Sequence, residues 1–173
     1  MSHLAVSDII SSEKFDAFYQ AAEQFSSFVE NDFTVDSDDY LRDLHDRLVI
    51  LYETAMNVPW IDLQSASDYR NSFDKPYIQK VVNSIADNLQ DKRYYWDVSN
   101  PIRSGDKQEV MKRNLVDDVG NIFKAIKYSL NIFNSGKQDS KEVALWQFKF
   151  DFEYHWGSNC INAIRALHFH ILK

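Results

Sequence analysis

Glycine and proline are scarce in this sequence, with 4 and 3 copies among 173 residues. Tight turns and β-hairpins depend on glycine for positive φ angles and on proline for a fixed φ angle. Their scarcity therefore argues against a β-sandwich or β-barrel and favours long helices with few connections. The sequence also lacks internal repeats, low-complexity tracts and linkers, so we expect one domain over residues 1–173.

Cysteine is nearly absent as well, because Cys160 is the only copy. One thiol cannot form an intrachain disulfide, and a lone cysteine suits a reducing compartment. No run of about 20 apolar residues is present, so the sequence predicts no transmembrane helix and no membrane partner. The N-terminus lacks the basic leader and apolar run of a signal peptide. These absences predict a cytoplasmic protein.

Positive charge is outnumbered, since 19 Lys and Arg residues stand against 26 Asp and Glu residues, for a net charge of -7. Domains that bind nucleic acid normally carry a basic patch. No run of Lys or Arg would form one here, so we expect no nucleic-acid partner. An acidic chain suits a basic protein partner, although acidic surfaces also serve solubility.

Sequence motifs for catalysis and cofactor binding are also missing. The chain has no glycine-rich phosphate loop, no H-E-x-x-H zinc motif and no G-x-S-x-G elbow. Di-iron bundles use Glu-x-x-His, whereas Glu153 and His155 stand two residues apart and point about 200° apart on a helix. We therefore predict no catalytic residue, no metal site and no cofactor, and we favour a protein that is not an enzyme.

Apolar residues are plentiful at 45%, and aromatic residues reach 14%. Their recurrence at three- and four-residue steps is typical of amphipathic helices. The periodicity predicts five helices over residues 12–33, 37–57, 74–90, 106–134 and 140–171, with a short extra helix near 61–69. The segment 91–105 is too aromatic for a solvated loop. The predicted fold class is all-α, a bundle of about five long, mostly antiparallel helices with an irregular aromatic segment packed on it.

The last predicted helix carries polar residues on its apolar side. At 100° per residue, Glu153, Gly157, Cys160 and His168 fall on one line with large apolar side chains. A carboxylate in a core costs several kcal/mol unless it is paired or protonated. We therefore expect Glu153 to have a partner. The candidate partners are Arg47, His45, Tyr94 and Tyr95.

These positions have a structural and a functional interpretation. Glu153 either ties the helix to a neighbour by a hydrogen bond, or acts as a ligand or acid–base group in a polar pocket. Gly157 costs roughly 1 kcal/mol relative to alanine in mid-helix, which the close approach of a helix, of aromatic rings or of a ligand would offset. His168 lies near the helix C-terminus, where a cation is favoured. The candidate ligand-binding residues are Glu153, Gly157, His168, Tyr95 and Trp96.

Three other polar or reactive residues have structural interpretations. Cys160 is expected to act as a small buried hydrophobe, because no histidine is placed to activate its thiol. His155 is expected to pair at the surface with Asp151, four residues earlier. Asp118 flanks the apolar stripe of the fourth predicted helix, and we expect it on a solvated, partly paired face.

The C-terminal part of the sequence resembles a known bacterial family. The segments Leu145–Gly157 and Asn162–His168 are similar to the C-terminal signature of the family called domain of unknown function 5063. The segment Tyr94–Val98, followed by Pro101, resembles a second recurring block of that family. The two blocks and the order of the helices cover most of the chain. The resemblance implies a short, all-helical protein and implies no reaction.

The sequence departs from the family in the fourth predicted helix. Members tend to carry more acidic residues where this chain has Asn121 and Ala125. A site that depended on those acids would be absent from this chain.

Three functional hypotheses follow from the sequence. The first is a non-catalytic protein-interaction module, either a homodimer or an adaptor for a basic partner. The second is a helical bundle with an internal small-ligand or metal site near Glu153 and His168, which could serve an enzyme. The third is an inhibitor or immunity-type protein that neutralises a toxin.

Overall fold

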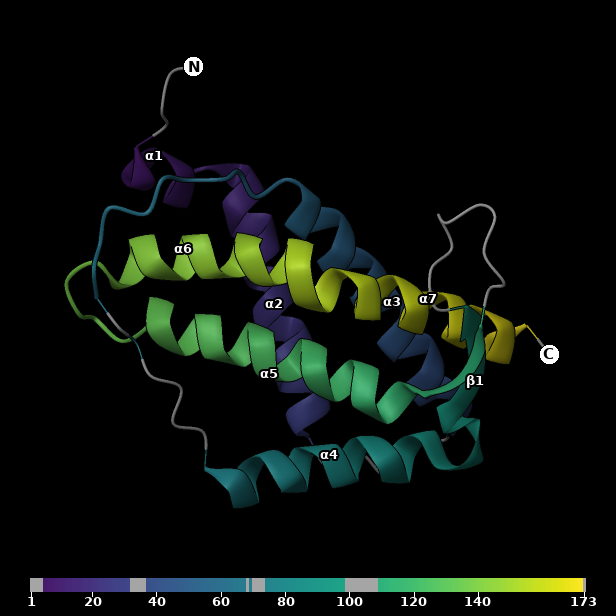
Figure 1. The fold of residues 1–173 in the computed structure, drawn as a ribbon. Coiled ribbons are helices and arrows are strands. Elements are labelled where there is room, and N and C mark those ends of the chain that lie inside the picture. Colours follow the sequence, from purple (N-terminus) through teal and green to yellow (C-terminus); the bar gives the residue numbers. More distant parts are fainter. Residues whose placement is uncertain (1–4, 32–36, 68, 70–73, 99–108, 173) are drawn as a thin grey trace.

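The computed structural model describes residues 5–31, 37–67, 69, 74–98 and 109–172, and most of these residues are helical (Figure 1). The α-helices are α1 (Val6–Ile10), α2 (Glu13–Glu30), α3 (Ser37–Met56), α4 (Lys75–Leu89), α5 (Leu115–Phe133), α6 (Ser140–Asp151) and α7 (Gly157–Ile171). A 3₁₀ turn η1 (Gln90–Arg93), a π-helical turn η2 (Phe152–Trp156) and two strands, β1 (Tyr94–Val98) and β2 (Val110–Asn114), complete the elements. None of the described helices is long and apolar enough to cross a membrane.

The long helices form the predicted all-α bundle. Helices α6 and α7 continue one another through η2, and α5 lies beside them in the opposite direction (Figure 1). Helix α4 packs on the outer side of α5. Helices α2 and α3 pack against each other behind α5 and the α6–α7 rod, and α3 contacts α7. Neighbours on two sides make the α6–α7 rod a central element.

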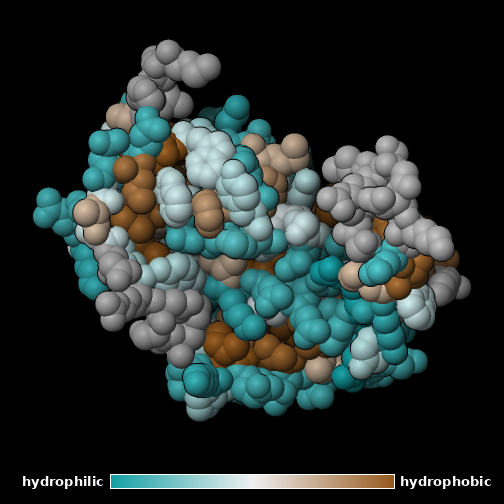
Figure 2. Space-filling model, viewed as in Figure 1, coloured by the Kyte–Doolittle hydropathy of each residue, from teal (hydrophilic) through white to brown (hydrophobic). Residues whose placement is uncertain are grey.

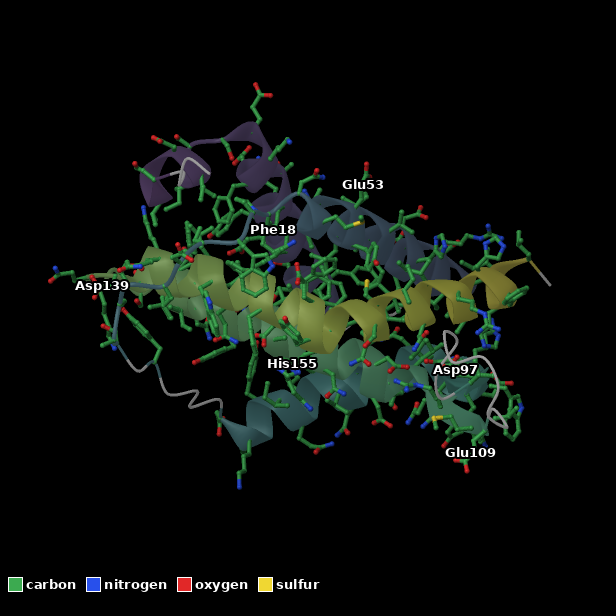
Figure 3. All side chains as sticks on the ribbon, turned by 45° about the horizontal axis from the view of Figure 1, so that its top comes forward. Phe18, Glu53, Asp97, Glu109, Asp139 and His155 are labelled. Carbon is green, nitrogen blue, oxygen red and sulfur yellow. The ribbon has the colours of Figure 1, made fainter. Side chains whose placement is uncertain are left out.

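One continuous core cluster draws buried side chains from each of the seven α-helices. The ring of Phe18 lies inside the bundle (Figure 3) and meets Phe148 edge-on, with 5.0 Å between the ring centroids. Phe28 of α2 stacks on Tyr40 of α3 at 5.1 Å. Such pairs add specific ring contacts to the burial of large apolar areas, so the high aromatic content fills the space between helices.

Local signals in the sequence set several of the helix ends. The Ser12 side chain accepts the backbone N–H of Phe15 at 3.2 Å and so forms the N-cap of α2. That helix ends at Glu30, before the predicted end at Phe33, and Phe33 itself lies outside the described part of the chain. Helix α1 and the turn η1 were not predicted.

The short helix predicted near 61–69 is wrong. The described residues of that segment have no helical structure. The side chain of Glu142, in the first turn of α6, accepts the backbone N–H groups of Gln64 and Ser65. In a helix, these two N–H groups would bond to backbone carbonyls of the same helix. Here they bond to Glu142 instead, and residues 60–67, which we call the strap, run over α6.

The fourth helix begins later than predicted. Residues 106–108 lie outside the described part of the chain, and β2 occupies Val110–Asn114, where a helix was expected. Strand β2 pairs antiparallel with β1, so that Tyr94 faces Asn114 and Val98 faces Val110. The Asn114 side chain then accepts the N–H of Val116 at 3.0 Å as the N-cap of α5. Backbone groups bonded across a strand pair cannot also close helical turns, and this delays the helix.

The π-helical turn η2 changes the register of the C-terminal helix. The buried seam of α6–α7 includes Phe148, Trp156 and Cys160, with the partly buried Phe152 between them. Three successive four-residue steps would drift by about 40° each on an ideal α-helix. The wider turn removes that drift, so the four side chains keep facing the core.

Gly157 is required by the geometry of this turn. Its N–H donates to the carbonyl oxygen of Phe152, five residues earlier, and a Cβ at position 157 would lie 2.3 Å from that oxygen. The expected close approach at Gly157 therefore exists, but it comes from the helix's own backbone. Neither a neighbouring helix nor the rings of Tyr95 and Trp96 supply it.

A Gly157→Ala substitution should destabilise the fold by about 1–3 kcal/mol, because the added methyl group collides with rigid backbone. The matched control is Gly120→Ala in α5, where a Cβ would meet the Val82 side chain at an ordinary 3.5 Å. There alanine should leave stability unchanged or raise it by up to about 1 kcal/mol. Urea unfolding followed by circular dichroism measures the stability of both variants. Equal effects of the two substitutions would contradict the conclusion that the turn requires glycine at position 157.

Candidate functional site

Glu153 lies at the surface and not in the core, so the prediction that it is buried is wrong. Its carboxylate accepts the indole N–H of Trp60 at 2.9 Å and lies 3.2 Å from the Lys149 ammonium. In the described part of the chain, none of the four candidate partners forms a hydrogen bond or ion pair with it; Arg47, for instance, lies over the ring of Phe28. The helical wheel failed because it assumed one uniform period through the π-helical turn.

His168 is also exposed, with its ring centroid 6.3 Å from that of His45. It follows Glu153 by fifteen residues, which is roughly 22 Å along a helix at 1.5 Å per residue. The structure therefore does not bring Glu153, Gly157 and His168 together around one cavity.

Tyr95 and Trp96 point to opposite faces of β1. The Tyr95 hydroxyl donates to Asp118 at 2.7 Å, while Trp96 is 66% exposed. Arg113 of β2 donates to the same carboxylate at 2.8 Å and to the Asn159 side chain at 3.3 Å. Asp118 is only 2% exposed, so its expected position on a solvated face is wrong. Burial and the carboxylate of Asp118 raise the pKa of the Tyr95 hydroxyl, and Asp118 raises the pKa of Arg113.

An open groove of about 570 Å³ runs along the surface between α5 and the α6–η2–α7 rod. Hydrophilic residues line this seam on the face shown in Figure 2, and His155 lies on the edge of the rod that faces α5 (Figure 3). The groove is lined by Asn121, Lys124, Ala125, Tyr128, Gln147, Asp151, Tyr154, His155 and Asn159. We call it the polar groove. It includes both positions, 121 and 125, where the resemblance indicated missing acids.

Asp151 is the buried carboxylate of the polar groove. It is 7% exposed and accepts one hydrogen bond, from the Gln147 amide at 2.8 Å. The Nε2 atom of His155 lies 3.8 Å from its other oxygen, beyond hydrogen-bond distance, so the expected pairing is loose. Burial raises the pKa of the Asp151 carboxyl, while Gln147 and His155 partly oppose the shift.

A row of aromatic rings borders the polar groove on the rod. Trp146 stacks on Phe150 at 4.7 Å and 14°, and Phe150 contacts Tyr154 at 5.0 Å. Trp60, in the strap, adds its ring 6.4 Å from that of Tyr154. We call these four residues the aromatic strip. The four-residue spacing of 146, 150 and 154 could have revealed three of them, but Trp60 joins only through the tertiary fold.

Metal and thiol chemistry find no support in the described part of the chain. No three His, Cys, Asp or Glu side chains gather there as metal ligands. Cys160 is buried, as predicted, and burial raises the pKa of its thiol. A thiol that resists ionisation is a poor nucleophile.

Replacing Asp151 with Asn should reveal the raised pKa. Between the ordinary value of 3.8 and the higher folded pKa, the folded state holds a proton that the unfolded state has released. Wild-type stability therefore falls as pH rises through that window, whereas Asp151→Asn escapes this loss. The variant should be more stable by about 1 kcal/mol at neutral pH, and the difference should vanish below pH 3.8. Urea unfolding across pH tests this, with exposed Asp117→Asn as the control; a pH-independent difference would contradict it.

Tyr95 and Trp96 of β1 should respond differently to substitution. Tyr95→Phe removes a hydrogen bond to a buried carboxylate and should cost about 1–3 kcal/mol. Trp96→Ala should change stability by less than about 0.5 kcal/mol because the ring is mostly exposed. Thermal unfolding of both variants checks the contrast, and a larger loss for Trp96→Ala would refute it.

Comparisons with known proteins agree with this fold. The crystal structure of protein BF1032 from Bacteroides fragilis is similar over 92% of this chain and 93% of that chain, with a TM-score of 0.78 and 21% sequence identity. At that identity, the likeness speaks for the fold alone. No curated protein matches the chain. A family model described as "Domain of unknown function (DUF5063)" matches residues 9–173. The chain therefore belongs to the DUF5063 family.

Proposed function

We propose that this protein is a cytoplasmic, non-catalytic interaction module that binds a basic protein partner through the aromatic strip. The observation that carries the proposal is the exposure of large rings in a fixed arrangement. Trp60 is 44% exposed and Tyr154 is 65% exposed. Their rings contact one another, Phe150 contacts Tyr154, and Trp146 stacks on Phe150.

Aromatic anchors of this kind suit protein recognition. Trp and Tyr are enriched among the residues that dominate binding energy in protein interfaces. The indole N–H of Trp60 donates to Glu153 at 2.9 Å, and within the strip Trp146 stacks on Phe150, which contacts Tyr154. Side chains already held in place lose less conformational entropy on binding.

Charge favours a basic partner over a second copy of the chain. Two copies at -7 each repel one another, whereas a basic surface is attracted. The exposed faces of Trp60 and Tyr154 can also accept Lys or Arg side chains by cation–π contact. An inhibitor that neutralises a toxin would be one form of this module. The identity of the captured partner, a toxin or another basic protein, distinguishes the two cases.

Photocrosslinking tests the proposal. The crosslinker p-benzoylphenylalanine replaces Tyr154 or, as a matched exposed control on α7 outside the strip, Ile161. In the cells from which the sequence comes, position 154 should capture a basic protein that position 161 does not. That crosslink should weaken at high salt and disappear in a Trp60→Ala background that keeps its helical circular dichroism.

Two outcomes would overturn it. Crosslinks from position 154 only to a second copy of this chain would indicate self-association instead. The same set of proteins captured from both positions would show that the strip has no specific partner.

A further inference from the structure

The polar groove is built from two helical faces that look across at each other. Asn121, Lys124, Ala125 and Tyr128 follow one face of α5 at three- and four-residue steps. Gln147, Asp151, His155 and Asn159 follow the facing edge of the rod at four-residue steps, through the π-helical turn. Residues three and four apart share a helix face, so each wall presents a continuous row of polar groups.

The two walls carry opposite charges that do not meet. Asp151 is the one carboxylate of the lining and Lys124 its one ammonium. Within the described part of the chain, no ion pair joins Lys124 to Asp151 or to any other carboxylate. Both charged groups therefore face the groove and can still form an ion pair or hydrogen bonds with a ligand.

Asp118 shows how this bundle otherwise treats a buried carboxylate. Asp118 receives the Arg113 guanidinium at 2.8 Å and the Tyr95 hydroxyl at 2.7 Å. Asp151 is buried to a similar degree, but the neutral Gln147 amide is its one hydrogen-bond donor among the described residues. An ionised carboxylate accepts several hydrogen bonds and is costly to bury without a cation. Asp118 has a cation at hydrogen-bond distance, and Asp151 lacks one, since the His155 Nε2 atom lies 3.8 Å away.

A ligand with a single charge would satisfy only one wall. A cation bound to Asp151 would be repelled by Lys124, and an anion bound to Lys124 would be repelled by Asp151. A ligand with a positive and a negative end would pair with both. The amides of Asn121 and Gln147 can donate to or accept from such a ligand, and the Tyr154 ring borders its path.

From this arrangement we infer that the polar groove binds a small zwitterion of the amino-acid class, with its ammonium on Asp151 and its carboxylate on Lys124. The site is a different surface from the proposed protein contact, although the two share Tyr154. It lies beside the π-helical turn, which is a feature frequently found at functional sites.

A series of ω-amino acids tests the inference, because the length of each reports the separation of the two charges. Glycine, 4-aminobutyrate and 6-aminohexanoate are titrated at neutral pH into ¹⁵N-labelled protein, and the side-chain amide signals of Gln147, Asn121 and Asn159 are followed. One length should give saturable shifts with a Kd on the order of 1 mM. Hexanoate and hexylamine, which carry one charge each, should bind at least about tenfold more weakly.

Variants locate the site. Asp151→Asn and Lys124→Gln should each weaken binding of the best probe by about tenfold or more, while Asp117→Asn, on the exposed side of α5, should leave it unchanged. The amide spectrum of each variant also shows whether it is folded. Binding of the single-charge probes as tight as that of the zwitterions, or no saturable shift from any probe up to about 50 mM, would overturn the inference. Neither result bears on the aromatic strip, whose test depends on Trp60 and position 154.

Discussion

The close approach of the Phe152 carbonyl to Gly157 is the constraint on which much of this structure depends. Only a residue without a Cβ allows that carbonyl to accept the N–H of position 157 and form the π-helical turn. The turn keeps Phe148, Trp156 and Cys160 on the core side of one long rod. It also places Asp151 and His155 on the wall of the polar groove while Glu153 faces out. One local irregularity thus sets both the packing and the surface chemistry of the rod.

Two buried aspartates show how differently the same bundle can use a carboxylate. Asp118 is bound by groups from both strands of the hairpin, and its role is to dock β1 and β2 onto α5. Asp151 accepts a hydrogen bond only from Gln147, has His155 at the longer distance of 3.8 Å, and opens onto a groove. A buried charge that is not needed for docking, next to an uncommon helical turn, departs from what stability alone would favour. Departures of that kind concentrate at functional sites.

The aromatic strip and the polar groove lie side by side on the rod and share Tyr154. The strip offers flat, fixed rings, which suit a protein surface. The groove offers separated opposite charges, which suit a small polar molecule. Because Trp60 reaches the strip from the strap, and Glu142 ties the strap to α6, the strip depends on that segment's attachment. A ligand in the groove would touch a residue of the strip, which places the two surfaces within reach of one another.

The all-α class and most of the helix ends could be predicted from the sequence, because three- and four-residue periodicity and capping are local properties. Ser12 caps α2, as serine often does at a helix start, and the last helix spans the predicted residues 140–171. The start of α5 could not be predicted, because the pairing of β2 with β1 joins backbone groups from distant parts of the chain. Glu153 was misplaced because a wheel assumes one period, although the successive four-residue steps at 148, 152, 156 and 160 carried a signal of the wider turn. The candidate site was decided only by tertiary structure: Trp60 reaches Tyr154, and Lys124 faces Asp151 across a groove, through the packing of segments that no local pattern relates.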